Sequence, residues 1–129
     1  MTLRYRIGTA IIASFVFGLC AATILKAQSK TPGYIYVEID VKDKDGYMKD
    51  FLPKAQANIK EFGGKYIAGG FDKATSLSGQ PIPNRVLIFQ YPDMDAVKAF
   101  NEKERQLEAE VGSKYATFRA VAVEGIEQK

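Results

Sequence analysis

The feature that most restricts the fold of this chain is a strict alternation of side-chain types over residues 34–41. Four apolar side chains alternate there with four tyrosine or acidic side chains: Ile35, Val37, Ile39 and Val41 against Tyr34, Tyr36, Glu38 and Asp40. A period of two predicts a β-strand with one dry face and one polar-aromatic face. Such a strand needs a second layer of structure to cover its apolar face.

A helix is predicted to supply part of that layer directly after the strand. Asp43 or Asp45 can cap its start, and Gly63-Gly64 is typical of its end. Pro53 predicts a break near residues 51–52, after which the second and longer part begins with Pro53 in its first turn. An apolar stripe at spacings of three and four marks the buried side: Tyr47, Phe51, Ala55, Ile59 and Phe62.

The rest of the chain predicts two further strands, a loop, a second helix and a last strand. The expected ranges are a strand over 65–74 with a bulge or a close backbone approach at Gly69-Gly70, a loop over 75–84, a strand over 85–91, a helix from Pro92-Asp93 to Gly112, and a strand over 115–124. The charged stretch 102–110 is expected to face solvent. The order β-α-β-β-α-β predicts an α+β, ferredoxin-like sandwich with both helices on one face of the sheet.

The second face of such a sheet is left uncovered by the chain itself. If the apolar side of residues 34–41 meets the helices, the open face is expected to carry Tyr34, Tyr36, Glu38, Arg85, Leu87, Phe89 and Tyr91. Because exposing so many aromatic side chains is costly, we expect a homodimer that packs two sheets face to face. This dimeric α/β barrel would hold a pocket between its sheets.

Glu38 and Arg85 are the candidate catalytic residues of that pocket. Desolvation would raise the pKa of the Glu38 carboxyl and let it act as an acid or base. Arg85 could pair with Glu38 or hold an anionic substrate. The alternative is a structural ion pair that closes the end of the barrel. The candidate ligand-pocket residues are Tyr36, Tyr66, Phe89 and Tyr91, and Arg119 is a further candidate for ligand contact.

Composition excludes several kinds of site. The chain has no histidine, and its one cysteine is Cys20, so neither a histidine-dependent triad nor a zinc or histidine-ligated haem site of ordinary type can form. We therefore predict no cofactor and no metal. The formal charge of +3 comes from Arg4, Arg6 and Lys26, which leaves residues 30–129 neutral. A neutral domain without a basic stripe argues against nucleic acid as a partner.

Residues 1–29 are predicted to be a secretory signal peptide. Arg4 and Arg6 precede an uncharged stretch over 7–25, and Ala27-Gln28-Ser29 fits a small-residue cleavage site. The alternatives are an uncleaved membrane anchor over 7–25 and lipidation of Cys20. A signal peptide and an anchor both place residues 30–129, a single ferredoxin-like domain, outside the cytoplasm, in the periplasm or beyond it.

A set of short motifs lies over residues 36–41, Tyr47, residues 51–55, 63–70 and 83–86, Phe89, and residues 92–96 and 123–125. In these motifs the chain resembles the domain of unknown function 1330 family. It implies a dimeric α/β barrel of ferredoxin-like subunits and no particular reaction. This chain departs from the family pattern at residues 100–104, where relatives often carry a tryptophan-containing stretch followed by Ser-Pro-Glu-Tyr.

Three functions are compatible with these observations. The first hypothesis is an exported homodimer that binds a small, aromatic or carboxylated molecule between its sheets. The alternative is a cofactor-independent monooxygenase- or isomerase-like enzyme, with Glu38 as base and Arg85 as anion clamp. A purely structural or interaction protein is the third, and fold analogy cannot choose among them.

Overall fold

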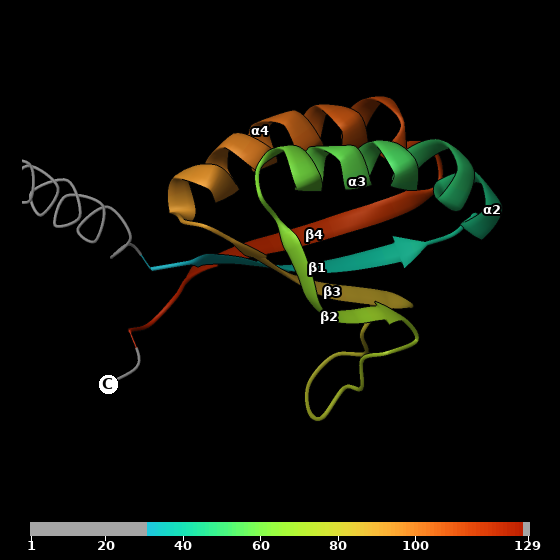
Figure 1. Cartoon of the computed structure of the whole chain (residues 1–129). Helices are drawn as coiled ribbons and strands as arrows, with labels where there is room; N and C mark the ends of the chain where they lie inside the picture. Colours follow the sequence, from blue (N-terminus) through green and yellow to red (C-terminus); the bar gives the residue numbers. More distant parts are fainter. Residues whose placement is uncertain (1–30, 128–129) are drawn as a thin grey trace, which may run out of the picture. The chain divides into compact units, whose positions relative to one another are not determined.

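The computed structural model describes residues 31–127 of the chain (Figure 1). The predicted leader over 1–29, with its alternatives of an anchor or a lipidated Cys20, lies outside the described residues and stays a prediction. Within residues 31–127, no helix is both long enough and apolar enough to cross a membrane.

The fold is an α+β sandwich of the predicted ferredoxin-like order. Its four strands are β1 (Gly33–Val41), β2 (Lys65–Phe71), β3 (Arg85–Tyr91) and β4 (Ala116–Glu124). They form one antiparallel sheet in the order β2-β3-β1-β4, with β1 and β3 at its centre. The dry face predicted for residues 34–41 is confirmed, because Ile35, Val37, Ile39 and Val41 are all buried.

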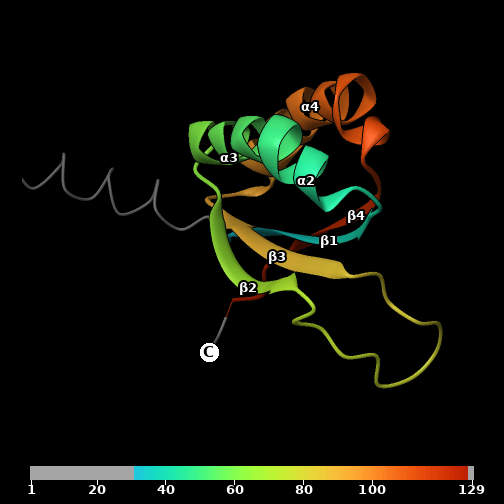
Figure 2. The ribbon, with the colours of Figure 1, turned by 90° about the vertical axis from the view of Figure 1, so that its right-hand side faces the viewer.

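Two helical segments follow β1 and β3 and cover the same face of the sheet. The first consists of α2 (Lys44–Gly46), a π-helical turn η1 (Tyr47–Phe51) and α3 (Leu52–Glu61). The second consists of α4 (Met94–Glu110), followed by a short 3₁₀ turn η2 (Gly112–Lys114). Figures 1 and 2 show α3 and α4 side by side above the sheet, and the loop between β2 and β3 projects on the other side. No helix of residues 31–127 covers that other face.

The predicted helix signals act as expected. The side chains of Asp43 and Asp93 accept hydrogen bonds from the backbone N–H groups of Gly46 and Ala96, at 3.0 and 2.8 Å. Pro53 lies in the first turn of α3, and the π-helical turn comes directly before it. A proline ring clashes with the carbonyl four residues earlier in a regular helix, so the wider turn lets the chain continue.

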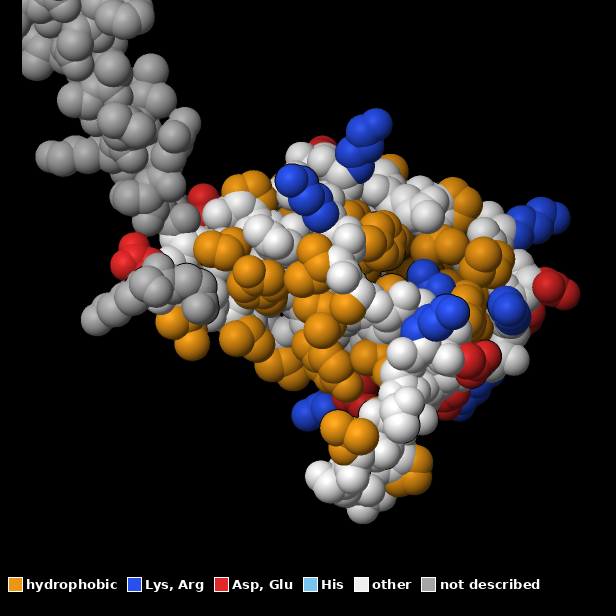
Figure 3. All heavy atoms as spheres, turned by 60° about the horizontal axis from the view of Figure 1, so that its bottom comes forward, with side chains coloured by type: hydrophobic (Ala, Val, Ile, Leu, Met, Phe, Trp, Pro, Cys, Tyr) orange, Lys and Arg blue, Asp and Glu red, His pale blue; other side chains and the backbone are white. Residues whose placement is uncertain are grey.

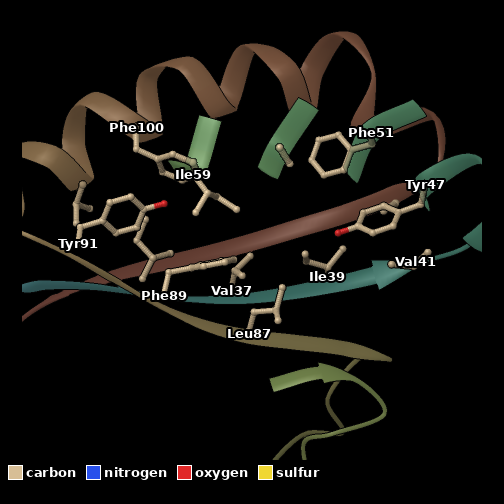
Figure 4. Close-up of a cluster of buried hydrophobic side chains, with 14 residues drawn as sticks. Val37, Ile39, Val41, Tyr47, Phe51, Ile59, Leu87, Phe89, Tyr91 and Phe100 are labelled. Carbon is tan, nitrogen blue, oxygen red and sulfur yellow. The ribbon is translucent and has the colours of Figure 1, made fainter. Parts of the chain in front are cut away.

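The core lies between the helix layer and the sheet (Figure 4). Phe51 and Ile59 point down from the first helical segment, Phe100 points down from α4, and apolar side chains of β1 and β3 point up. The hydroxyl groups of Tyr47 and Tyr91 point toward one another from opposite ends of this cluster.

The predicted face of β3 is wrong. Ile35 lies opposite Phe89, Val37 opposite Leu87 and Ile39 opposite Arg85, and residues directly opposite in a sheet share a face. Arg85, Leu87, Phe89 and Tyr91 therefore point toward the helices and are buried. Val86, Ile88 and Gln90 share the open face with Tyr34, Tyr36 and Glu38 instead.

Strand β2 ends at Phe71, three residues before the predicted end, and its irregularity comes at Ile67, just before the two glycines. The pairing with β3 shifts by one residue between Tyr66 and Ala68. The loop that follows is held at its base by Asn84. The side-chain amide of Asn84 exchanges two 2.9 Å hydrogen bonds with the backbone of Val41. The backbone carbonyl of Asn84 accepts a third hydrogen bond from the backbone N–H of Asp72.

Gly69 tests how tightly β2 is held against β3. Its φ of +100° is one that side chains disfavour, and an added Cβ would collide with the carbonyl oxygen of Val86. We expect Gly69→Ala to lower the free energy of unfolding by about 2 kcal/mol or more in urea denaturation. Gly79→Ala is the matched control, because Gly79 also has a positive φ but open space around it. Equal losses in the two variants would show that the collision with β3 contributes nothing.

Candidate functional site

A cavity of about 50 Å³ lies inside the sandwich, between the sheet and both helical segments. A volume of roughly 10–15 Å³ by this measure already holds one water molecule, so this space accommodates a small ligand group. Apolar side chains form most of its wall. Six side chains bring polar groups to it: Tyr47, Tyr66, Arg85, Asn101, Glu104 and Glu108.

Arg85 is the buried cation of this cavity. Its exposed fraction is only 8%, because β3 places it under the helix layer. Its guanidinium carbon lies 4.5 Å from the ring centre of Phe71 and 5.7 Å from that of Tyr47. Within the described residues, the Nε atom of Arg85 has no hydrogen-bond partner. The two rings offset part of the cost of burying the charge but offer it no anion.

Glu104 is the buried acid of the same cavity. It projects from α4, its exposed fraction is 7%, and its Oε1 atom lacks a hydrogen-bond partner among residues 31–127. Burial, followed by the charge of Glu108, raises the pKa of Glu104 to about 8, although a hydrogen bond with Asn58 opposes the shift. Glu104 is therefore protonated and uncharged at neutral pH, and it can donate a hydrogen bond.

Three tyrosines add hydroxyl groups around the two buried ionisable side chains. Burial raises the pKa of Tyr47 to about 12, and it also raises the pKa values of Tyr66 and Tyr91. All three stay protonated at neutral pH. The hydroxyl of Tyr91 has no hydrogen-bond partner in the described part of the chain. Tyr66 packs edge-on against Phe89, with ring centres 4.8 Å apart.

A groove of about 380 Å³ between α4 and β4 adjoins the cavity. Ile35, Asn101, Glu108, Phe118 and Ala120 line both spaces, so the groove leads into the cavity. Its own wall adds the charged side chains of Lys98 and Arg105. Together the groove and the cavity have the size of an ordinary small-molecule site.

The structure divides the predicted site residues between the two faces of the sheet. Arg85, Tyr66 and Phe89 line the cavity, and Tyr91 is buried on the same side. Tyr36 and Glu38 lie on the opposite face. The predicted pairing of Glu38 with Arg85 is wrong: Glu38 forms a 2.6 Å ion pair with Arg119, its cross-strand neighbour on β4.

Sequence reasoning missed Glu104, the acid of the cavity, because it lies in the charged stretch expected to face solvent. Its spacing does carry a signal. Glu104 follows Val97 by seven positions and Phe100 by four, which puts it on the buried stripe of α4. Asn58 was likewise not singled out, although it is buried on α3. Among residues 31–127, no group of three or more acidic side chains could hold a metal ion.

The sequence pattern of the family described as "Domain of unknown function (DUF1330)" matches residues 32–126 of this chain. No curated protein matches the chain significantly.

Two solved structures are similar in fold. A crystal structure of methylated RPA0582 protein covers 84% of this chain and 90% of its own, at 14% identity and a TM-score of 0.55. A second, of RPA0582 from Rhodopseudomonas palustris, described as a protein of unknown function, covers 84% of this chain and 93% of its own. Its identity is 15% and its TM-score is 0.49. At this identity the likeness concerns the fold alone.

The raised pKa of Glu104 predicts how stability depends on pH. The unfolded carboxyl titrates near 4.5 and the folded one near 8, so the folded chain holds its proton more tightly. The contribution of this group to stability is complete below about pH 4.5 and declines as the pH rises to about 8. We expect Glu104→Gln, which cannot ionise, to be more stable than wild type at about pH 9, by about 1 kcal/mol or more.

Urea denaturation at about pH 5 and about pH 9 measures the free energy of unfolding of wild type and of Glu104→Gln. We expect the two values to differ little at about pH 5. Glu102→Gln, at an exposed position of the same helix, is the control and should show no such difference. If the stabilities of wild type and Glu104→Gln followed the same pH profile, the carboxyl of Glu104 would be ionised in the folded protein.

Proposed function

The chain belongs to the DUF1330 family, and we propose that it is a homodimer whose subunits each bind a small molecule between the helices and the sheet. The cavity stands in place of the pocket expected between two sheets. The binding site proposed here is thus formed by one subunit, and the open sheet face is left to the partner.

The observation that carries the binding proposal is the incomplete hydrogen bonding of the buried polar side chains. Buried side-chain atoms are normally hydrogen-bonded, and leaving one without a partner costs about 1–3 kcal/mol. Arg85, Glu104 and Tyr91 each keep such an atom within the described residues. Two of these three side chains line the cavity. A ligand with polar atoms would complete these bonds and recover part of that free energy.

The open face of the sheet supports the dimer. Figure 3 shows apolar side chains spread over this face. Val121 and Val123 of β4 are 41% and 51% exposed, and they lie beside the half-buried tyrosines of β1. Leu77 is 94% exposed in the loop that projects on this side (Figures 1 and 2). Soluble monomers rarely leave so continuous an apolar surface in water, and a second copy of the sheet would cover it.

The alternative of an enzyme with Glu38 as base and Arg85 as anion clamp has no support in the geometry. The two side chains lie on opposite faces of the sheet, and Glu38 is paired with Arg119. Neither side chain can therefore act with the other on one substrate within a subunit. We do not propose a reaction.

A charge on the open sheet face is expected to break the dimer. Val121→Glu would bury a carboxylate without a partner in the interface, which is strongly unfavourable. We expect light scattering after size-exclusion chromatography to give the mass of two chains for wild type and of one chain for Val121→Glu. Gln106→Glu, on the exposed surface of α4, is the matched control and should remain a dimer. A wild-type protein with the mass of a single chain would contradict the proposal.

The binding proposal predicts that the cavity takes up a small neutral probe. We expect benzamide to bind saturably and to shift the NMR signals of Leu87 and Phe89, which line the cavity. Ala120→Leu should weaken this binding, because Ala120 lines both the cavity and the groove. Ala122→Leu is the matched control, since Ala122 lies on the same strand and lines the groove alone. An absence of saturable binding, or equal loss in both variants, would count against the cavity as the site.

A further inference from the structure

We propose that the cavity binds a monocarboxylate with an apolar body, and that Arg85 holds the carboxylate while the body lies among the apolar side chains of the core. This inference rests on the function proposed above and adds the chemical class of the ligand.

Arg85 has no counter-ion among residues 31–127. The two ion pairs between side chains of the described residues join Lys103 to Glu61 and Arg119 to Glu38, and neither includes Arg85. Its guanidinium lies against two aromatic rings and interacts with the Tyr47 hydroxyl, none of which carries a charge, and its Nε atom has no hydrogen-bond partner among residues 31–127. Because such a charge is stabilised best by a desolvated anion with matching geometry, the site is incomplete without one.

Glu104 is not that anion. A carboxylate that pairs with a guanidinium has its pKa lowered, whereas burial raises the pKa of Glu104. As a protonated acid it is a neutral hydrogen-bond donor on the wall of the cavity. Tyr47 and Tyr66 line the same space and remain protonated. The other acidic side chain of the wall, Glu108, lies where the cavity meets the groove, and burial raises the pKa of Glu108 as well. The cavity therefore offers the positive charge of Arg85 beside several neutral donors, which suit a single carboxylate.

The apolar side chains of the cavity wall restrict the chemistry of the rest of the ligand. Leu87, Phe89 and Phe100 line the cavity together with Val37 and Ile39, and none of these side chains can pair with a second charge. The other cations near the site, Lys98 and Arg105, belong to the groove. A phosphate dianion would need a second positive charge beside Arg85, and the cavity has none among the described residues. A flat carboxylate on an apolar group fits both the charge and the walls.

Benzoate and benzamide form the test pair, because they share shape and differ in charge. We expect calorimetric titration of wild type at about pH 6.5 to show benzoate binding about tenfold tighter than benzamide, or more. Arg85→Met should remove this preference by weakening the binding of benzoate far more than that of benzamide, and a cooperative urea denaturation shows that the variant is folded. Arg105→Met removes a cation from the groove alone and should keep the preference.

A second measurement needs no change at Arg85. The groups that face Glu104 are Glu108 on its own helix, Asn58 on α3, Tyr47 on the π-helical turn, and Tyr66 and Tyr91 from the sheet. When Glu104 ionises above about pH 8, its charge should repel a carboxylate. We expect benzoate binding to weaken through this range in wild type and to persist in Glu104→Gln. Benzamide binding should change less.

The outcomes separate this inference from the proposal on which it rests. Benzamide binding without a preference for benzoate would overturn the carboxylate class and leave the binding cavity standing. No binding of either probe would contradict the proposed function itself. Loss of the preference in Arg105→Met and not in Arg85→Met would place the anion in the groove and overturn the role of Arg85.

Discussion

The register between β1 and β3 is the constraint on which the cavity depends. With Ile35 opposite Phe89 and Val37 opposite Leu87, the next pair along the helix-facing side is Ile39 with Arg85. A slip of one residue would move Arg85 to the open face and bring Val86 and Ile88 under the helices. The helices therefore pack on Leu87, Phe89 and Tyr91, the larger apolar side chains of β3, and Arg85 is buried on the same face.

Two aromatic side chains offset part of the free-energy cost of burying Arg85. Phe71 from β2 and Tyr47 from the π-helical turn both lie against the guanidinium of Arg85. Contacts of this kind contribute about 2 kcal/mol when they are desolvated, which is less than the cost of an isolated buried charge. The turn before Pro53 also brings Tyr47 and Phe51 together, with ring centres 5.2 Å apart. The irregular helix start therefore forms part of the wall of the cavity.

The two faces of the sheet differ in the side chains that they present. The helix-facing side combines a dry core with a few buried polar groups, which is the composition of a small-molecule site. The open side carries tyrosines, valines and the ion pair between Glu38 on the central strand β1 and the exposed Arg119 on the edge strand β4. Because alternate residues of each strand face opposite sides of the sheet, the proposed partner and the proposed ligand would contact different side chains.

Local patterns in the sequence determined the elements of this protein and their order. The period of two in β1, the aspartate caps, the glycines after α3 and Pro53 each act within a few residues, so the α+β order could be predicted from them. The face of β3 could not, since Val86 and Ile88 are as apolar as Leu87 and Phe89, and only pairing with the distant β1 chooses between the sets. The burial of Glu104 also depends on segments that are distant in the sequence. Its position on the stripe of α4 is visible in the sequence, but only packing against α3 and the sheet decides that a carboxyl there loses its water. Tertiary structure alone therefore brought Arg85 and Glu104 to one cavity, because desolvation depends on segments far apart in the chain.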